Sequence, residues 1–196
     1  MMKKTSKSIL CTILLLLVFG VVTVCGATEE PQKKKVAVIV LIDSHGVSKP
    51  NDVINGIYEN VHKKLEGHNI EIVPIEESRQ VARNYARENQ MTVMKKADLA
   101  AIATETGADF GIYVQAKVSN VQAKSGFLKA SIHKTITCEF RILDIAADKY
   151  KIDISFDDEG KSTAGPYGGM PSSDRAYMRA VDGALEQLTI DPLFFE

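Results

Sequence analysis

The stretch VAVIVLI, Val36–Ile42, is an unbroken run of seven apolar residues. A strand with one solvated face alternates apolar and polar residues, whereas a strand that is buried on both faces is apolar throughout. The run therefore predicts a strand in the interior of a sheet, and the remaining elements are read outward from it.

Helical spacing follows this strand. Between Pro50, which suits the first turn of a helix, and Gly67, which suits its end, apolar residues recur every three or four positions. A short strand is expected at Ile70–Ile75, followed by a polar helix at Glu76–Asn89 and another helix at Lys95–Thr106. The residues expected on the buried faces of these three helices are Val53, Ile54, Ile57, Val61 and Leu65, then Val81 and Tyr85, then Leu99, Ile102 and Ala103.

The second half of the chain changes its apolar period from helical to alternating. Alternation starts at Phe110, and turns are expected at Ser125-Gly126 and Ala147-Asp148, which predicts three strands joined as hairpins. A last helix is expected from about Ser173, after a glycine-rich loop. We therefore predict an α/β fold with α+β character: a mixed sheet with a buried first strand, antiparallel hairpins in its second half, and packed helices. The inward residues expected are Phe110, Ile112, Val114, Ala116 and Val118; Leu128, Ala130, Ile132, Ile136, Cys138, Phe140 and Ile142, with Lys134 as an exception; Tyr150, Ile152, Ile154 and Phe156; and Val181, Ala184, Leu185 and Leu188.

The amino terminus has the parts of a secretory signal peptide. Three lysines precede an apolar run from Ile9 to Val24, and small residues follow up to Ala27. The run is shorter than the roughly 20 residues that cross a bilayer as a helix. We expect export with cleavage after Ala27. The alternatives are a retained membrane anchor and lipidation at Cys25, although Val24 departs from the small residue that lipoprotein processing sites carry before the cysteine.

Removal of residues 1–27 would leave a chain long enough for one domain with a sizeable core. We expect residues 28–34 to form a linker, residues 35–190 a single α/β domain, and residues 191–196 a carboxyl-terminal tail. The aromatic residues of this tail are expected to fold back on the domain.

Charge excludes one class of partner. Without its first 27 residues the chain holds 21 basic and 25 acidic residues, a net charge of −4, and its one basic run, Lys33-Lys34-Lys35, falls at the predicted linker. A nucleic-acid binder needs a positive footprint that displaces counterions. We expect no nucleic-acid partner.

Cysteine usage leaves one thiol in the predicted mature chain. Cys11 and Cys25 lie in or beside the signal, so Cys138 has no partner for an internal disulfide. Its parity places Cys138 on the apolar face of a strand, where a thiol is buried and inert rather than nucleophilic.

The tetrapeptide Gly160-Lys161-Ser162-Thr163 matches the end of a nucleotide-binding phosphate loop. The full motif requires another glycine five residues before Gly160, where this chain has Ser155. The intervening Asp157, Asp158 and Glu159 would place three carboxylates beside a polyphosphate, and like charges about 4 Å apart repel by several kcal/mol near a protein surface. We expect no nucleotide.

Asp43, Ser44 and His45 directly follow the first strand and are the candidate ligand-binding residues, because ligands of open α/β sheets gather at the carboxyl ends of strands. Consecutive side chains point apart, however, whereas a nucleophile and its base must converge. The spacing of the histidines matches no metal site. We expect no catalytic residue, metal or cofactor; the alternative is a small-ligand site or a hydrolase at this loop.

Four segments follow one another in an order that is typical of a known family: KVAVIVLI, TGADFGIYVQAKV, EFRILDIAADKY and RAVDGALEQL. They resemble the periplasmic domains related to the curli secretion protein, to the amino-terminal domain of TolB, and to the lipoprotein activators of penicillin-binding proteins. The shared features are a Gly107-Ala108-Asp109 step into a strand and a strand that ends at Leu143-Asp144 before a turn. The turn at Ala146-Ala147-Asp148 lacks the glycine that members often carry, and no long inserted hairpins suggest a pore.

This resemblance implies a periplasmic α/β domain without shared catalytic residues. We therefore predict a non-enzymatic, exported envelope protein that binds another envelope protein, or itself, through exposed loops or a strand edge. A homo-oligomeric envelope subunit is a further alternative. Contact with a membrane is expected only through a retained signal or a lipid anchor.

Overall fold

The computed structural model describes residues 33–43, 47–89, 93–126, 129–164 and 170–195. Within these residues five strands form one mixed sheet in the order β2-β1-β3-β4-β5, accompanied by four α-helices. This is the α/β fold that the sequence predicts. The strands are β1 (Lys34–Ile42), β2 (Ile70–Ile72), β3 (Phe110–Ser125), β4 (Ala130–Asp144) and β5 (Lys149–Ala164); the helices are α2 (Pro50–Leu65), α3 (Ile75–Glu88), α4 (Lys96–Glu105) and α5 (Ser173–Glu186), followed by the short 3₁₀ helix η1 (Pro192–Phe195).

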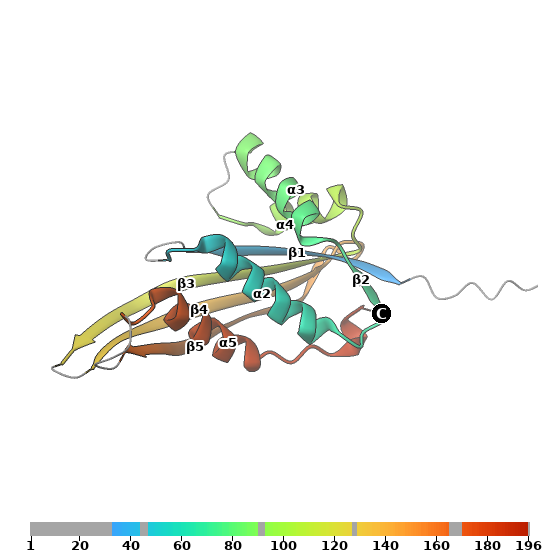
Figure 1. Ribbon diagram of the computed structural model, residues 1–196. Coiled ribbons are helices and arrows are strands. Elements are labelled where there is room, and N and C mark those ends of the chain that lie inside the picture. The colour runs from blue at the N-terminus through green and yellow to red at the C-terminus, as the bar shows by residue number, and fades with distance from the viewer. Residues whose placement is uncertain (1–32, 44–46, 90–92, 127–128, 165–169, 196) are drawn as a thin grey trace, which may run out of the picture. The chain divides into compact units, whose positions relative to one another are not determined.

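Helices cover both faces of the sheet, with α2 and α5 on one face and α3 and α4 on the other (Figure 1). Strand β1 pairs in parallel with β2 on one side and with β3 on the other. Residues 36–40 are buried, which confirms that the apolar run is a strand covered on both faces. The side chains of Val36, Val38 and Val40 pack toward α2 and α5, while those of Ala37 and Ile39 pack toward α3 and α4.

The second half of the sheet is antiparallel, as predicted. Strands β3, β4 and β5 follow one another as hairpins, and Cys138 in the middle of β4 pairs with Ala116 and Phe156. The first hairpin closes where the Gly126 N–H donates to the Lys129 carbonyl (2.8 Å). The second closes at Asp148, whose φ of 45° is the left-handed conformation of a tight turn.

Two sequence-based expectations need correction. Strand β2 ends at Ile72 instead of Ile75, because Pro74 leads the chain away and Ile75 already begins α3. Ile154, expected inward, is 38% exposed. Leu128 lies outside the described residues.

The end of the chain folds back on the domain. Phe195 is buried, and its ring stands 5.3 Å from the ring of Phe110 and 5.6 Å from that of His68. Among the described residues no helix is both long and apolar enough to cross a membrane. Residues 1–27, with the predicted cleavage and lipidation positions Ala27 and Cys25, lie outside the described ranges.

Candidate binding groove

Asp43 lies at the carboxyl end of β1, where the sequence places the candidate ligand-binding loop. Its N–H donates to the Ala116 carbonyl of β3 (2.9 Å), which continues the sheet by one residue. Ser44 and His45 lie outside the described residues, so the ligand-binding role of this loop stays a prediction. Within the described ranges, no three His, Cys, Asp or Glu side chains are grouped as a metal site.

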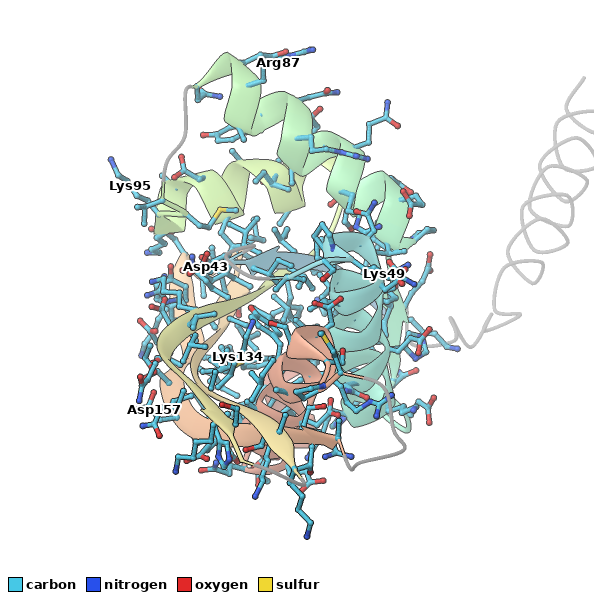
Figure 2. All side chains as sticks on the ribbon, turned by 60° about the vertical axis from the view of Figure 1, so that its left-hand side comes forward. Asp43, Lys49, Arg87, Lys95, Lys134 and Asp157 are labelled. Carbon is cyan, nitrogen blue, oxygen red and sulfur yellow. The ribbon has the colours of Figure 1, made fainter. Side chains whose placement is uncertain are left out.

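Lys134 of β4 interacts electrostatically with Asp43, a relationship that the sequence did not predict. It interrupts the apolar alternation of β4, yet its side chain is only 1% exposed, in the layer beneath α5 (Figure 2). Burial lowers the pKa of Lys134, and the carboxylates of Asp174 and Asp43 act in the opposite direction. Its Nζ also lies 5.5 Å from the centre of the Tyr177 ring.

Asp174 of α5 also caps a different helix. The residue before α2, Lys49, makes no side-chain capping bond of its own. Instead the Asp174 carboxylate accepts hydrogen bonds from the backbone N–H groups of Ser48 (2.7 Å) and Lys49 (3.2 Å). A negative charge is favourable at a helix amino terminus. Asp174, Asp43 and Lys134 therefore connect the sheet, α2 and α5.

Cys138 is buried, as its parity predicts. Burial raises the pKa of the thiol to about 12, and the nearby Glu139 adds to this rise. The thiol is therefore protonated near neutral pH and does not act as a nucleophile.

The segment that matches a phosphate loop is strand throughout. Gly160 and Ser162 face α5, where the Ser162 hydroxyl accepts a hydrogen bond from the Ser172 N–H (3.0 Å). Lys161 lies on the opposite face and pairs with His133 of β4. A committed strand cannot wrap its backbone amides around a phosphate, so the match to the motif is accidental.

The face of β3, β4 and β5 that carries Lys161 is a ladder of paired polar side chains. Lys117 binds Glu139 (2.7 Å), and Arg141 binds Asp153 (2.8 Å). These charged groups pair with one another at the surface, where ion pairs contribute little to the free energy of folding. Nothing in this ladder requires a ligand.

A cavity of about 230 Å³ opens at the other end of the sheet, beside β1. We call it the β1 groove. Helix α2 covers one face of β1 and α3 covers the opposite face, so the groove lies between two helices with the edge of the strand as its floor. Its lining residues are Val38, Ile39, Val40 and Leu41 of β1; Asn51 and Ile54 of α2; Ser78, Arg79, Ala82, Arg83 and Ala86 of α3; and Met94.

The floor of the β1 groove is a strand edge that pairs with no other strand in the described part of the chain. Strand β2 pairs with β1 only along residues 34–36, and the last bond of this pairing joins the Val73 N–H to the Val36 carbonyl (2.9 Å). Pro74 then turns the chain into α3. Because alternate residues of a strand direct their N–H and C=O groups to opposite edges, Val38 and Val40 direct theirs toward the groove, on the same side as Val36.

The α3 wall of the groove holds a buried hydroxyl. Ser78 is 0% exposed, and within the described part of the chain its Oγ has no hydrogen-bond partner. Such a group carries a desolvation cost of roughly 1–3 kcal/mol. Ser78 is also one of the residues that line the groove, so this polar atom lies in the groove wall.

The outer edge of β5 differs from the edge of β1. The Glu159 N–H donates to the side chain of Asp158 (2.6 Å), and Arg179 of α5 donates to the Lys161 carbonyl (2.5 Å). These side chains occupy backbone groups that an added strand would need. Self-capping of this kind, together with surface charge, protects edge strands against association.

Comparisons with known proteins identify no family. No family model and no curated protein matches the chain. Solved structures with a similar arrangement include the LpoB C-terminal domain from Escherichia coli, at 13% identity and a TM-score of 0.39, covering 68% of this chain and 87% of that one. Lipoprotein GNA1162 from Neisseria meningitidis is similar at 14% identity and a TM-score of 0.38, covering 70% of this chain and 87% of that one. The PelC dodecamer from Paraburkholderia phytofirmans is similar at 12% identity and a TM-score of 0.37, covering 81% of this chain and 89% of that one.

Bacterial lipoproteins are thus among the chains that this one is similar to, at low identity. With TM-scores below 0.5, these similarities carry no argument about activity or partner.

Proposed function

We propose that this chain is an exported, non-enzymatic binding module of a bacterial cell envelope that holds a protein partner by strand addition in the β1 groove. One observation carries the proposal: among the described residues no strand pairs with the edge of β1 at Val38 and Val40, and this edge is the floor of an apolar groove that Ser78, whose hydroxyl has no partner there, also lines. An added strand would satisfy these backbone groups and would bury the alanine-lined wall of α3.

The size of the groove favours a strand over a whole small molecule. Its volume of about 230 Å³ is below the roughly 300–1,000 Å³ of typical small-molecule sites. The four residues of β1 that line the groove, Val38–Leu41, match a guest of about four residues, or about 13 Å at about 3.3 Å per residue. Such a guest would lie where β2 would continue if Pro74 did not divert the chain.

Export is part of the proposal and rests on the first 27 residues. Cleavage after Ala27 would release the mature chain into the envelope. The intact mass of the protein recovered from expressing cells tests this directly: a chain beginning at Thr28 supports the proposal, whereas the full mass indicates a retained anchor and a diacylated Cys25 indicates a lipoprotein.

Filling the groove tests the binding function. Ala82 lines the groove on α3, and Ala97 is exposed on α4, outside the groove lining. A photo-crosslinking residue at Asn51, on the rim, would capture the bound partner in the native envelope. We expect the crosslinked product to disappear in the Ala82→Trp variant and to persist in the Ala97→Trp control. An identical product in both variants would contradict binding in the groove.

The partner is either a different envelope protein or a second copy of the chain. Light scattering on the purified protein separates the two. A dimer that the Ala82→Trp variant abolishes would identify the second copy as the occupant.

A further inference from the structure

We infer that the occupant of the β1 groove is an extended segment with a carboxylate side chain, an aspartate or a glutamate, that binds Arg83. The inference rests on the proposed function, because it specifies the chemistry of the strand added to β1.

The charge of the groove lining has one sign. Its two charged residues are both arginines, Arg79 and Arg83, although the chain as a whole has a net charge of −1. The other lining residues are apolar or neutral. A guest that brings a negative charge would meet positive charge in the lining, whereas a basic guest would be repelled.

The two arginines have different roles. Arg79 is 18% exposed and is held by Glu76 (3.1 Å) and by the Asn55 side-chain oxygen (2.9 Å). Arg83 lies one helical turn further along α3 and is exposed, and within the described ranges it makes no hydrogen bond or ion pair. Its guanidinium can therefore take a carboxylate in the two-pronged geometry that arginine favours.

The spacing along α3 fits an extended guest. Ser78 precedes Arg83 by five residues, or about 7.5 Å at 1.5 Å per helical residue. Two residues of a strand cover about 6.6 Å. A guest whose backbone bonds Ser78 would thus place a side chain near Arg83 two residues away, on the same face of its strand. The wall between these positions is Ala82, whose small side chain leaves the space for the guest.

The test is a selection with full-length protein purified after export from expressing cells. A random dodecapeptide library would be selected on this protein and counter-selected on the Ala82→Trp variant, so that only groove-dependent peptides remain. Selected peptides would be labelled with fluorescein, and their affinities measured by anisotropy. We expect enrichment of aspartate and glutamate, and a loss of at least about tenfold in affinity when the acid is replaced by its amide, as for a charge-assisted hydrogen bond.

Two variants on α3 assign the carboxylate to its partner. Arg83→Glu should weaken the acidic peptides at least about tenfold and improve peptides that carry lysine in place of the acid. Arg87→Glu makes the same charge change at the outer end of α3, outside the groove lining, and should change affinity less than about twofold (Figure 2). Ser78→Ala should weaken acidic and amide peptides by the same factor, about fivefold.

The outcomes separate the inference from the function on which it rests. Groove-dependent peptides without acidic enrichment, or with affinities that Arg83→Glu leaves unchanged, would overturn the inference and leave strand addition standing. Failure to select any groove-dependent peptide would overturn both. Circular dichroism and melting temperatures of each variant establish that the fold is retained.

Discussion

Gly160 of β5 and Ala176 of α5 lie so close that no larger residue fits at position 160. A Cβ atom built on Gly160 would stand 1.8 Å from the Ala176 carbonyl oxygen and 2.5 Å from the Ala180 backbone nitrogen. Both obstacles are helix backbone, which cannot rotate away as a side chain does. The glycine of the apparent phosphate-loop motif is therefore a packing position, where α5 crosses the sheet at close range.

Gly160→Ala should destabilise the domain by about 3 kcal/mol, since α5 must move to admit the methyl group. The measurement is the free energy of unfolding in urea. Gly126→Ala is the matched control, because its Cβ would have ordinary contact at 3.6 Å and should change stability by no more than about 0.5 kcal/mol. Equal effects of the two substitutions would show that the close crossing does not exist.

Asp174→Ala removes both the cap of α2 and a negative charge near buried Lys134. Loss of a cap costs about 1 kcal/mol, and an undercompensated buried charge adds to this cost. We therefore expect a loss of more than about 1 kcal/mol in the urea unfolding free energy.

A double-mutant cycle separates the two effects of Asp174. In the Lys134→Met background the charge contribution disappears, so Asp174→Ala should cost less there than in the wild-type background. Strictly additive losses would mean that Asp174 acts on α2 alone.

The thiol of Cys138 should react only when the domain unfolds. Its pKa of about 12 and its complete burial leave almost no accessible thiolate at pH 8. Alkylation by iodoacetamide, followed by mass spectrometry, should be undetectable in the native protein and complete in urea. Rapid alkylation of the native protein would show that the apolar face of β4 is open.

Asp182 on α5 gives a pH-dependent contribution to stability. Burial raises its pKa above the ordinary 3.8, although the hydrogen bond from the Asn60 amide (2.6 Å) opposes the rise. A raised pKa means that the folded carboxyl holds its proton more tightly than the unfolded one. The favourable contribution is therefore full below pH 3.8 and is lost as the pH rises through the folded-state pKa.

Asp182→Asn should remove this dependence, because an amide does not titrate. We expect the melting temperature of the variant, relative to wild type, to increase between about pH 4 and about pH 7. A difference that is constant across this range would contradict the raised pKa.

Sequence patterns located most of the core because burial dictates residue type. The continuous apolar run gave β1, and helical spacing gave the buried face of α2. Ile54 is the one residue predicted on that face that is only partly buried, and it lines the β1 groove. The departure from the pattern thus coincides with the site.

Other features depend on contacts between distant residues. Lys134 was read as an exception to the alternation of β4, whereas the carboxylates of α5 and of the end of β1 allow it to be buried. The apolar alternation of the last strand stops at Phe156, whereas pairing with β4 carries β5 to Ala164.

The β1 groove was not predicted, although the sequence holds two signals of it. Pro74 marks the point at which β2 must end, and Ala82 and Ala86 place small residues one turn apart on α3. Neither signal shows that the two features lie beside the same strand edge, since this follows only from the packing of α2 and α3 on opposite faces.

The central claim is that Val38 and Val40 offer free backbone groups to a partner strand. Amide hydrogen exchange, resolved by residue, measures this directly. Without a partner, the Val38 and Val40 amides should exchange faster than those of Ala37 and Ile39, which face β3. A groove-binding peptide should slow Val38 and Val40 by at least about tenfold and leave Ser155 and Asp157 of the β5 edge unchanged. Equal protection of all four β1 amides in the free protein, or protection by the peptide at β5 instead of β1, would contradict the claim.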